Sequence, residues 1–151
     1  MVSGKRGVGL VVAAVLFAGA GLCSHHSLAK GALAIALPDD VAKSGFSYGL
    51  TINRSNAEKA KAAALATCRE NTDKEQLRPL CKVIVVFDNA CVAVAMDPKE
   101  GTPGVGWAVA PDKKVAEADA MYQCRATVGD SRRDFCQIQR STGCDGSAGA
   151  R

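Results

Sequence analysis

Small and large apolar residues alternate along the segment that starts at residue 31. The segment GALAIAL has one face of alanines and one face of larger side chains, namely Ala32, Ala34 and Ala36 against Leu33, Ile35 and Leu37. A period of two predicts a β-strand, and a face of alanines allows a helix to pack closely on it. The segment FSYGLTI predicts a second strand whose apolar face holds Phe46, Tyr48, Leu50 and Ile52.

The pattern then changes to helical spacing. Ser55 and Glu58 form a capping-box pattern that predicts the start of a helix. The apolar stripe of this helix is Ala57, Ala60, Ala64 and Cys68. A second helix is expected after Asp112, a candidate N-cap, with the stripe Ala116, Ala120 and Cys124.

The chain repeats this pattern. Shifted by fifty-nine residues, GALAIALPDDVAKSGFSYGLTI falls without a gap on ACVAVAMDPKEGTPGVGWAVAP, and the cysteines that follow come in the same order. We expect two strand-strand-helix-strand repeats, at about 31–88 and 90–141. Within them, CKVIVVF is apolar on both faces and should lie centrally, and FCQIQR is more polar and should lie nearer an edge.

The repeats predict an α+β fold in which one antiparallel-rich sheet carries two helices. Half of the chain is too short to form a core alone, so both repeats should share a single domain over 30–151.

The first 29 residues read as a secretory signal peptide. Lys5 and Arg6 precede an uncharged apolar run, 8–22, and Ser27-Leu28-Ala29 provides a cleavage site of small residues. The run is shorter than the roughly 20 apolar residues of a membrane-spanning helix. A retained anchor and a lipoprotein site at Cys23 stay open as alternatives. Localisation is then secreted or periplasmic.

Cleavage after Ala29 leaves six of the seven cysteines, an even number that predicts a disulfide framework in an exported domain. Equivalent positions in the repeats predict equivalent bonds, Cys68–Cys81 and Cys124–Cys136. Cys91 and Cys144 are left to join. Both histidines, His25 and His26, lie in the removed segment, so a zinc site would need cysteines or carboxylates alone, and we expect no metal.

Charge and motifs remove further classes of function. Loss of Lys5 and Arg6 lowers the formal net charge from +4 to +2, and the longest basic runs are the pairs Lys113-Lys114 and Arg132-Arg133. Nucleic acid is therefore not an expected partner. The string GTPGVG lacks the ending of a phosphate-binding loop and reads as a hairpin loop, so no cofactor is expected.

Three stretches together resemble the secreted bacterial family catalogued as domain of unknown function family 4189. They are GFSYGLTINRSNAEKAKAAALATCRE, CKVIVVFDNACVAVA and GWAVAPDKKVAEADAMYQCRA. The resemblance covers about residues 31–145 and departs in the last strand, where Gln137 and Gln139 replace more usual apolar residues. It implies export and this domain, and it supplies no catalytic residues.

The chemistry of the residues leaves three classes of function. A histidine-dependent nucleophile is excluded in 30–151, apart from lysine-based variants. We expect a non-catalytic binding or interaction domain whose partner is a protein or an envelope component. The alternatives are a small enzyme, with Asp39, Asp40, Asp97 and Glu100 as its carboxylates, and an effector or inhibitor of another protein. Tyr48 and Trp107 are expected in the core rather than on an aromatic binding shelf.

Export should remove residues 1–29, because the apolar run is too short to span a bilayer and ends near small residues. N-terminal sequencing of the exported protein is expected to begin at Lys30. A mature chain that retains the apolar run, or that carries lipid on Cys23, would contradict the assignment.

Overall fold

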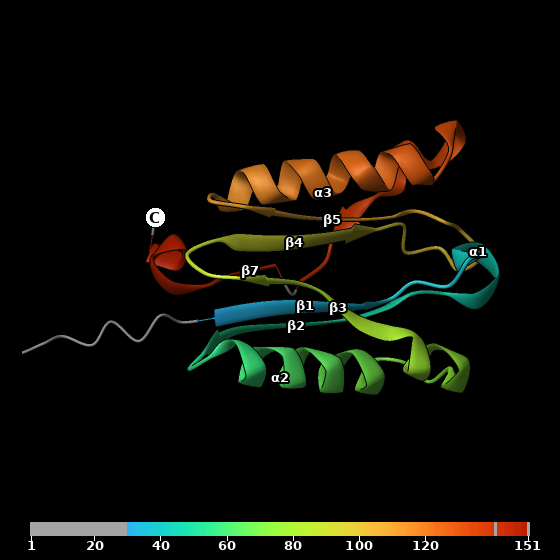
Figure 1. Cartoon of the computed structure of the whole chain (residues 1–151). Coiled ribbons are helices and arrows are strands. Elements are labelled where there is room, and N and C mark those ends of the chain that lie inside the picture. The colour runs from blue at the N-terminus through green and yellow to red at the C-terminus, as the bar shows by residue number, and fades with distance from the viewer. Residues whose placement is uncertain (1–29, 141, 151) are drawn as a thin grey trace, which may run out of the picture.

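The computed structural model describes residues 30–140 and 142–150, so the expected signal peptide and its cleavage site lie outside the described residues. The elements form four layers in the order helix, sheet, sheet, helix (Figure 1). The two sheets are antiparallel and face each other, and each helix covers the outer face of one sheet.

The first half forms one helix-covered sheet. Its elements are β1 (Lys30–Ala36), α1 (Val41–Ser44), β2 (Ser47–Arg54), α2 (Ala57–Glu70), the 3₁₀ helix η1 (Glu75–Leu80) and β3 (Cys81–Phe87). The strands are ordered β2-β1-β3. The alanine face of β1 packs under Ala60, Ala64 and Cys68 of α2, as the sequence pattern predicts.

The elements of the second half include no counterpart of α1 between the first two strands. They are β4 (Cys91–Met96), β5 (Val105–Ala110), α3 (Lys113–Thr127), η2 (Asp130–Phe135), β6 (Gln137–Ile138), β7 (Gly143–Cys144) and η3 (Gly146–Ala150). The strands are ordered β5-β4-β6, and β7 also pairs with β4. Ala116, Ala120 and Cys124 of α3 pack on the alanines of β4 and β5.

The α+β class with antiparallel strands is confirmed, but the expectation of one continuous sheet is wrong. Each half keeps its own sheet because its larger side chains face the other half. Leu33 and Ile35 of β1 pack against Val92 and Val94 of β4 in a core between the sheets. Tyr48 and Trp107 pack against this core as expected, but both stay partly exposed.

The expectation that CKVIVVF lies centrally is also wrong, because β3 is the end strand of its sheet. Both faces of β3 are nevertheless covered, one by α2 and the other by the second sheet, and this explains its apolar residues on both sides. A register shift leaves Ile84 as an extra residue between Val83, which pairs with Ala34, and Val85, which pairs with Leu33. The expected edge position of FCQIQR is confirmed by β6.

The helix starts are set by side-chain caps. Asp112 accepts hydrogen bonds from the backbone N–H of Lys114 and Val115, which confirms it as the N-cap of α3. The N-cap of α2 is Asn56, whose Oδ1 accepts from Lys59 N at 2.9 Å, and not the expected Ser55. Asn and Ser are equally good caps, and the helix begins one residue later than the capping-box pattern places it.

Two glycines let the helix backbones approach the sheets. A Cβ at Gly49 would lie 2.2 Å from the carbonyl oxygen of Ala64, and a Cβ at Gly106 would lie 2.3 Å from that of Ala120. These glycines therefore occupy the same position against their helices. The ungapped alignment holds for the strand pairing, because Ala36 pairs with Ser47 as Ala95 pairs with Gly106. Only the residue that faces the helix differs, since the alignment matches Gly49 with Ala108. The loop between the first two strands is longer in the first half, where it forms α1.

Disulfides join Cys68 to Cys81, Cys124 to Cys136 and Cys91 to Cys144, the same pairs that the symmetry of the sequence indicates. The first connects the last turn of α2 to Cys81, the first residue of β3, and the second connects the last turn of α3 to Cys136, the residue just before β6. The third ties β7 to β4, where the two cysteines are direct cross-strand partners.

The C-terminal segment is also fixed by polar contacts. Asp145 is fully buried, and its Oδ1 accepts from the backbone N–H of Asn53 at 2.6 Å. The Oδ1 of Asn89 accepts from the backbone N–H of Ser147 at 3.1 Å. Asn53 and Asn89 both have positive φ, a conformation that asparagine tolerates better than most residues. The segment therefore closes one side of the sandwich.

Replacement Gly106→Ala should destabilise the protein by about 3 kcal/mol, because the added methyl overlaps the backbone of α3 and forces the helix away from β5. Urea unfolding of the oxidised protein measures the change. Gly143→Ala is the matched control, since its Cβ would meet only side-chain atoms of Ile52 and Leu50, none nearer than 3.3 Å. Equal effects at the two positions would contradict the close-approach role.

Candidate functional site

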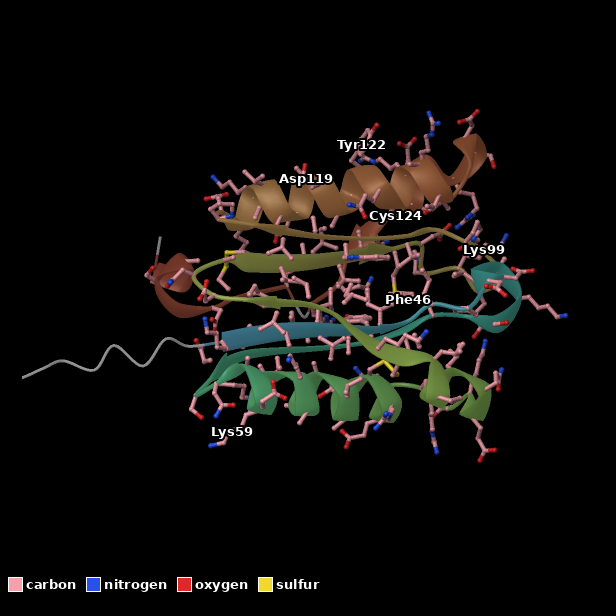
Figure 2. The ribbon with its side chains drawn as sticks, viewed as in Figure 1. Phe46, Lys59, Lys99, Asp119, Tyr122 and Cys124 are labelled. Atoms are coloured by element: carbon pink, nitrogen blue, oxygen red, sulfur yellow. A yellow bond between two sulfur atoms is a disulfide. The ribbon has the colours of Figure 1, made fainter. Side chains whose placement is uncertain are left out.

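A cleft of about 240 Å³ lies at the end of the sandwich where α1 and the β4–β5 loop meet. Three segments line it. They are Val41 to Phe46 in part, Asn71 to Lys74 with Leu77, and the β4–β5 loop from Met96 to Val105. Figure 2 shows Phe46 and Lys99 at this end of the molecule. The cleft is thus formed by both halves of the chain.

Asp97, which lines the cleft, forms an ion pair with the partly buried Arg132. Arg132 of η2 donates from Nε to Asp97 Oδ2 at 2.5 Å and from Nη2 to Asp97 Oδ1 at 2.8 Å. The carboxylate is fully buried, and the backbone N–H of Lys99 also donates to it at 3.0 Å. The guanidinium carbon lies 4.4 Å from the ring centre of Phe135, which makes a cation–π contact.

This pairing fixes the charge of Asp97. The hydrogen bonds from Arg132 lower the pKa of the Asp97 carboxyl to about 2, although burial acts in the opposite direction. The same hydrogen bonds raise the pKa of Arg132. Asp97 is therefore ionised and fully engaged at neutral pH, which suits it to hold η2 on the β4–β5 loop and not to donate a proton.

The four carboxylates singled out in the sequence do not converge. Asp97 and Glu100 line the cleft, whereas Asp39 and Asp40 are exposed and are absent from its lining. Asp40 serves as the N-cap of α1 and accepts from the backbone N–H of Lys43 at 3.0 Å. Sequence reasoning missed Arg132, whose partner lies 35 residues away in the chain. No local spacing signals that contact.

The described residues offer no cluster for a metal ion. No group of three or more histidine, cysteine, aspartate or glutamate side chains gathers within 30–140 and 142–150. All six cysteines of these ranges are paired in disulfides.

A second concave surface, called here the edge groove, lies where β3 of one sheet and β5 of the other run side by side. It is lined by Ile84, Val85, Trp107, Ala108, Val109, Asp119, Tyr122 and Gln123. Tyr122 is 75% exposed, and Ile84 and Val109 are about 40% exposed. Figure 2 shows Asp119 and Tyr122 on the outer side of α3. Exposed apolar side chains gathered in this way are typical of interaction surfaces.

Sequence reasoning missed this groove because it depends on which strands end the two sheets. Trp107 was expected in the core. Trp107 does contact the core, yet it also lines the groove, and Val109 on the same face is exposed because no strand of the other sheet covers it.

The model of the protein family described as domain of unknown function (DUF4189) matches residues 31–143. No curated protein and no solved structure matches the chain. Within the part of the chain that the structure describes, none of the helices has the length and apolar character needed to cross a membrane.

Replacement Asp97→Asn should remove an acid-sensitive part of the stability. The folded-state pKa is lowered, so the stabilisation is present above the unfolded-state value of 3.8 and is lost as pH falls from about 4 to about 2. Urea midpoints measured across this range should fall steeply in the wild type and less steeply in the variant. Asp130→Asn, which removes an exposed pair with Arg133, is the control. Identical pH profiles in wild type and Asp97→Asn would contradict the role.

Proposed function

The chain belongs to the DUF4189 family, whose description assigns no activity, and we propose from the structure that the protein is a secreted or periplasmic binding domain without catalysis. The observation that carries this proposal is the edge groove, an exposed apolar surface on a domain held by three disulfides. A rigid scaffold that presents apolar side chains loses little conformational freedom when it binds a partner.

The carboxylates give no comparable support for an enzyme. General acid–base catalysis needs a titratable group whose pKa lies near the working pH. The one buried acid in the cleft, Asp97, has a pKa of about 2 and both oxygens occupied by Arg132. Glu100 is exposed at the rim of the cleft.

The cysteine chemistry supports export. Structural disulfides persist in the periplasm and outside the cell and are rare in the cytosol. Every cysteine from residue 30 to 150 that the structure describes is paired, and the seventh cysteine, Cys23, falls in the segment that we assign to the signal peptide.

The arrangement of the halves supports an internal repeat within one domain over 30–151. Both halves have the order strand, strand, helix, 3₁₀ helix, strand, and both sheets place the first strand of the half in the middle. Each half also has a disulfide between its helix and its third strand or the residue just before it. We assign the repeats to about 31–88 and 90–141.

Site-specific photo-crosslinking in the producing cell tests the proposed function. A photoreactive residue would replace Tyr122 at the edge groove, Lys59 on α2 or Lys99 at the end cleft, three positions on separate surfaces (Figure 2). We expect a discrete adduct from at least one position, formed by exported protein that has no free thiol. Export without an adduct at any position, or a cytosolic protein with free thiols, would contradict the proposal.

A further inference from the structure

The two sides of the sandwich differ in what covers them. On one side, β7 and the C-terminal segment lie against β2, and Gly143 sits beside Leu50 and Ile52. On the other side, β3 and β5 end their sheets, and no further strand of the described residues pairs with either. The edge groove lies on this second side.

The end strand β5 is partly capped by α3. The side chain of Thr127 accepts from the backbone N–H of Val105 at 3.1 Å and donates to its carbonyl at 3.0 Å. One helical turn earlier, Gln123 accepts from the backbone N–H of Trp107 at 3.3 Å. These side chains occupy the hydrogen-bonding groups that a neighbouring strand would use.

The end strand β3 has no such cap. From Lys82 to Phe87, its backbone forms no hydrogen bond with any described residue outside its pairing with β1. The outer edge of β3 therefore presents free N–H and C=O groups next to an apolar groove, which is the arrangement that accepts an added strand.

The groove has one charged group, the carboxylate of Asp119. It lies one helical turn before Gln123, as Gln123 lies one turn before Thr127. Four residues advance about 6 Å along a helix and two residues advance about 6.6 Å along a strand, so Asp119 stands level with Val109. Asp119 forms no ion pair with the residues that the structure describes.

We propose that the edge groove binds an extended segment of another protein, which pairs with β3 and places a lysine or arginine side chain at Asp119. This inference rests on the proposed function. Backbone pairing with β3 supplies affinity that does not depend on sequence, and the groove selects alternate side chains. Ile84 and Val109 fit apolar side chains of the segment, and Tyr122 offers a ring to its cation.

A second copy of the chain fits this edge less well. Continuous pairing between two β3 strands is opposed by the bulge at Ile84 and by the exposed Lys82, both features that discourage edge-to-edge association. A single extended segment can adapt to the bulge. A second rigid sheet cannot, and it would also collide with Tyr122 of α3, which is largely exposed beside the groove.

Two libraries of blocked peptides test the inference, each as long as β3, which has seven residues. One library has lysine fixed at the centre and the other glutamate, and both have mixed valine, threonine, serine and tyrosine elsewhere. They are titrated to millimolar concentration into the oxidised exported protein, with amide shifts followed by NMR. We expect shifts at Lys82 to Phe87, and affinity about tenfold higher for the lysine library.

Two controls separate the contributions. Asp119→Asn should remove the preference for lysine and keep the pairing, whereas Glu117→Gln on the same helix, which removes the acid of an exposed pair with Lys113, should keep both. Peptides methylated on alternate backbone nitrogens should lose the shifts at β3, since they cannot pair on one edge.

Three results would overturn the inference. They are absence of shifts at Lys82 to Phe87 with both libraries, equal binding of both libraries, and concentration-dependent dimers that protect β3. Its failure is distinguishable from that of the proposed function. Adducts from Lys59 or Lys99 without peptide binding at β3 leave a binding domain that uses another surface, whereas absence of adducts from all three positions rejects the binding domain itself.

Discussion

The structure depends on how closely each helix lies on its sheet. Gly49 and Gly106 have no side chain at the points where Ala64 and Ala120 of the helices cross them, and any larger residue would overlap helix backbone. The remaining contacts are made mostly by alanines, which bury little apolar area each. The helices are therefore held by close packing of small residues rather than by large side chains. Because this packing buries little apolar area, the disulfide near the end of each helix adds stability to it.

Because small residues fill the layers between helix and sheet, the larger apolar residues lie between the two sheets. Leu33, Ile35, Phe87, Val92 and Val94 form the shared core, so neither half keeps a complete core without the other. The sheets are covered on both faces, and the sides of the sandwich become the places where strands can still be approached. One of these sides is closed by β7, and the other remains as the edge groove.

Local patterns predicted most of the fold. Period-two alternation located β1 and β2, helical spacing located α2 and α3, and equivalence of the two halves gave the disulfide pairs, because each of these depends on residues close in sequence or on symmetry. The division into two sheets was not predictable in this way. A strand such as β3 has the same apolar sequence pattern whether it lies in the middle of a sheet or at the end of a sheet with both faces covered.

The candidate sites were less accessible to sequence reasoning for the same reason. Asp97 and Arg132 meet only because η2 folds back on the β4–β5 loop, and an arginine in a polar segment has no signature of a buried partner. The edge groove combines residues of β3, β5 and α3, and its existence depends on where the sheets end. Asp97 was singled out from the sequence, but its engagement with Arg132 was visible only in three dimensions.

The bond between Cys91 and Cys144 also determines how the domain carries tension. The 53-residue separation of these cysteines spans β5, α3 and β6, so a pull on the C-terminus passes from Cys144 directly to β4. The second unit then lies in a covalent loop that bears no load. The force is transmitted through β3 and the first unit, where the bond between Cys68 and Cys81 bypasses only a short segment. One wall of the edge groove, β3, therefore belongs to the half that bears the force, and the other wall, formed by β5 and α3, belongs to the half that does not.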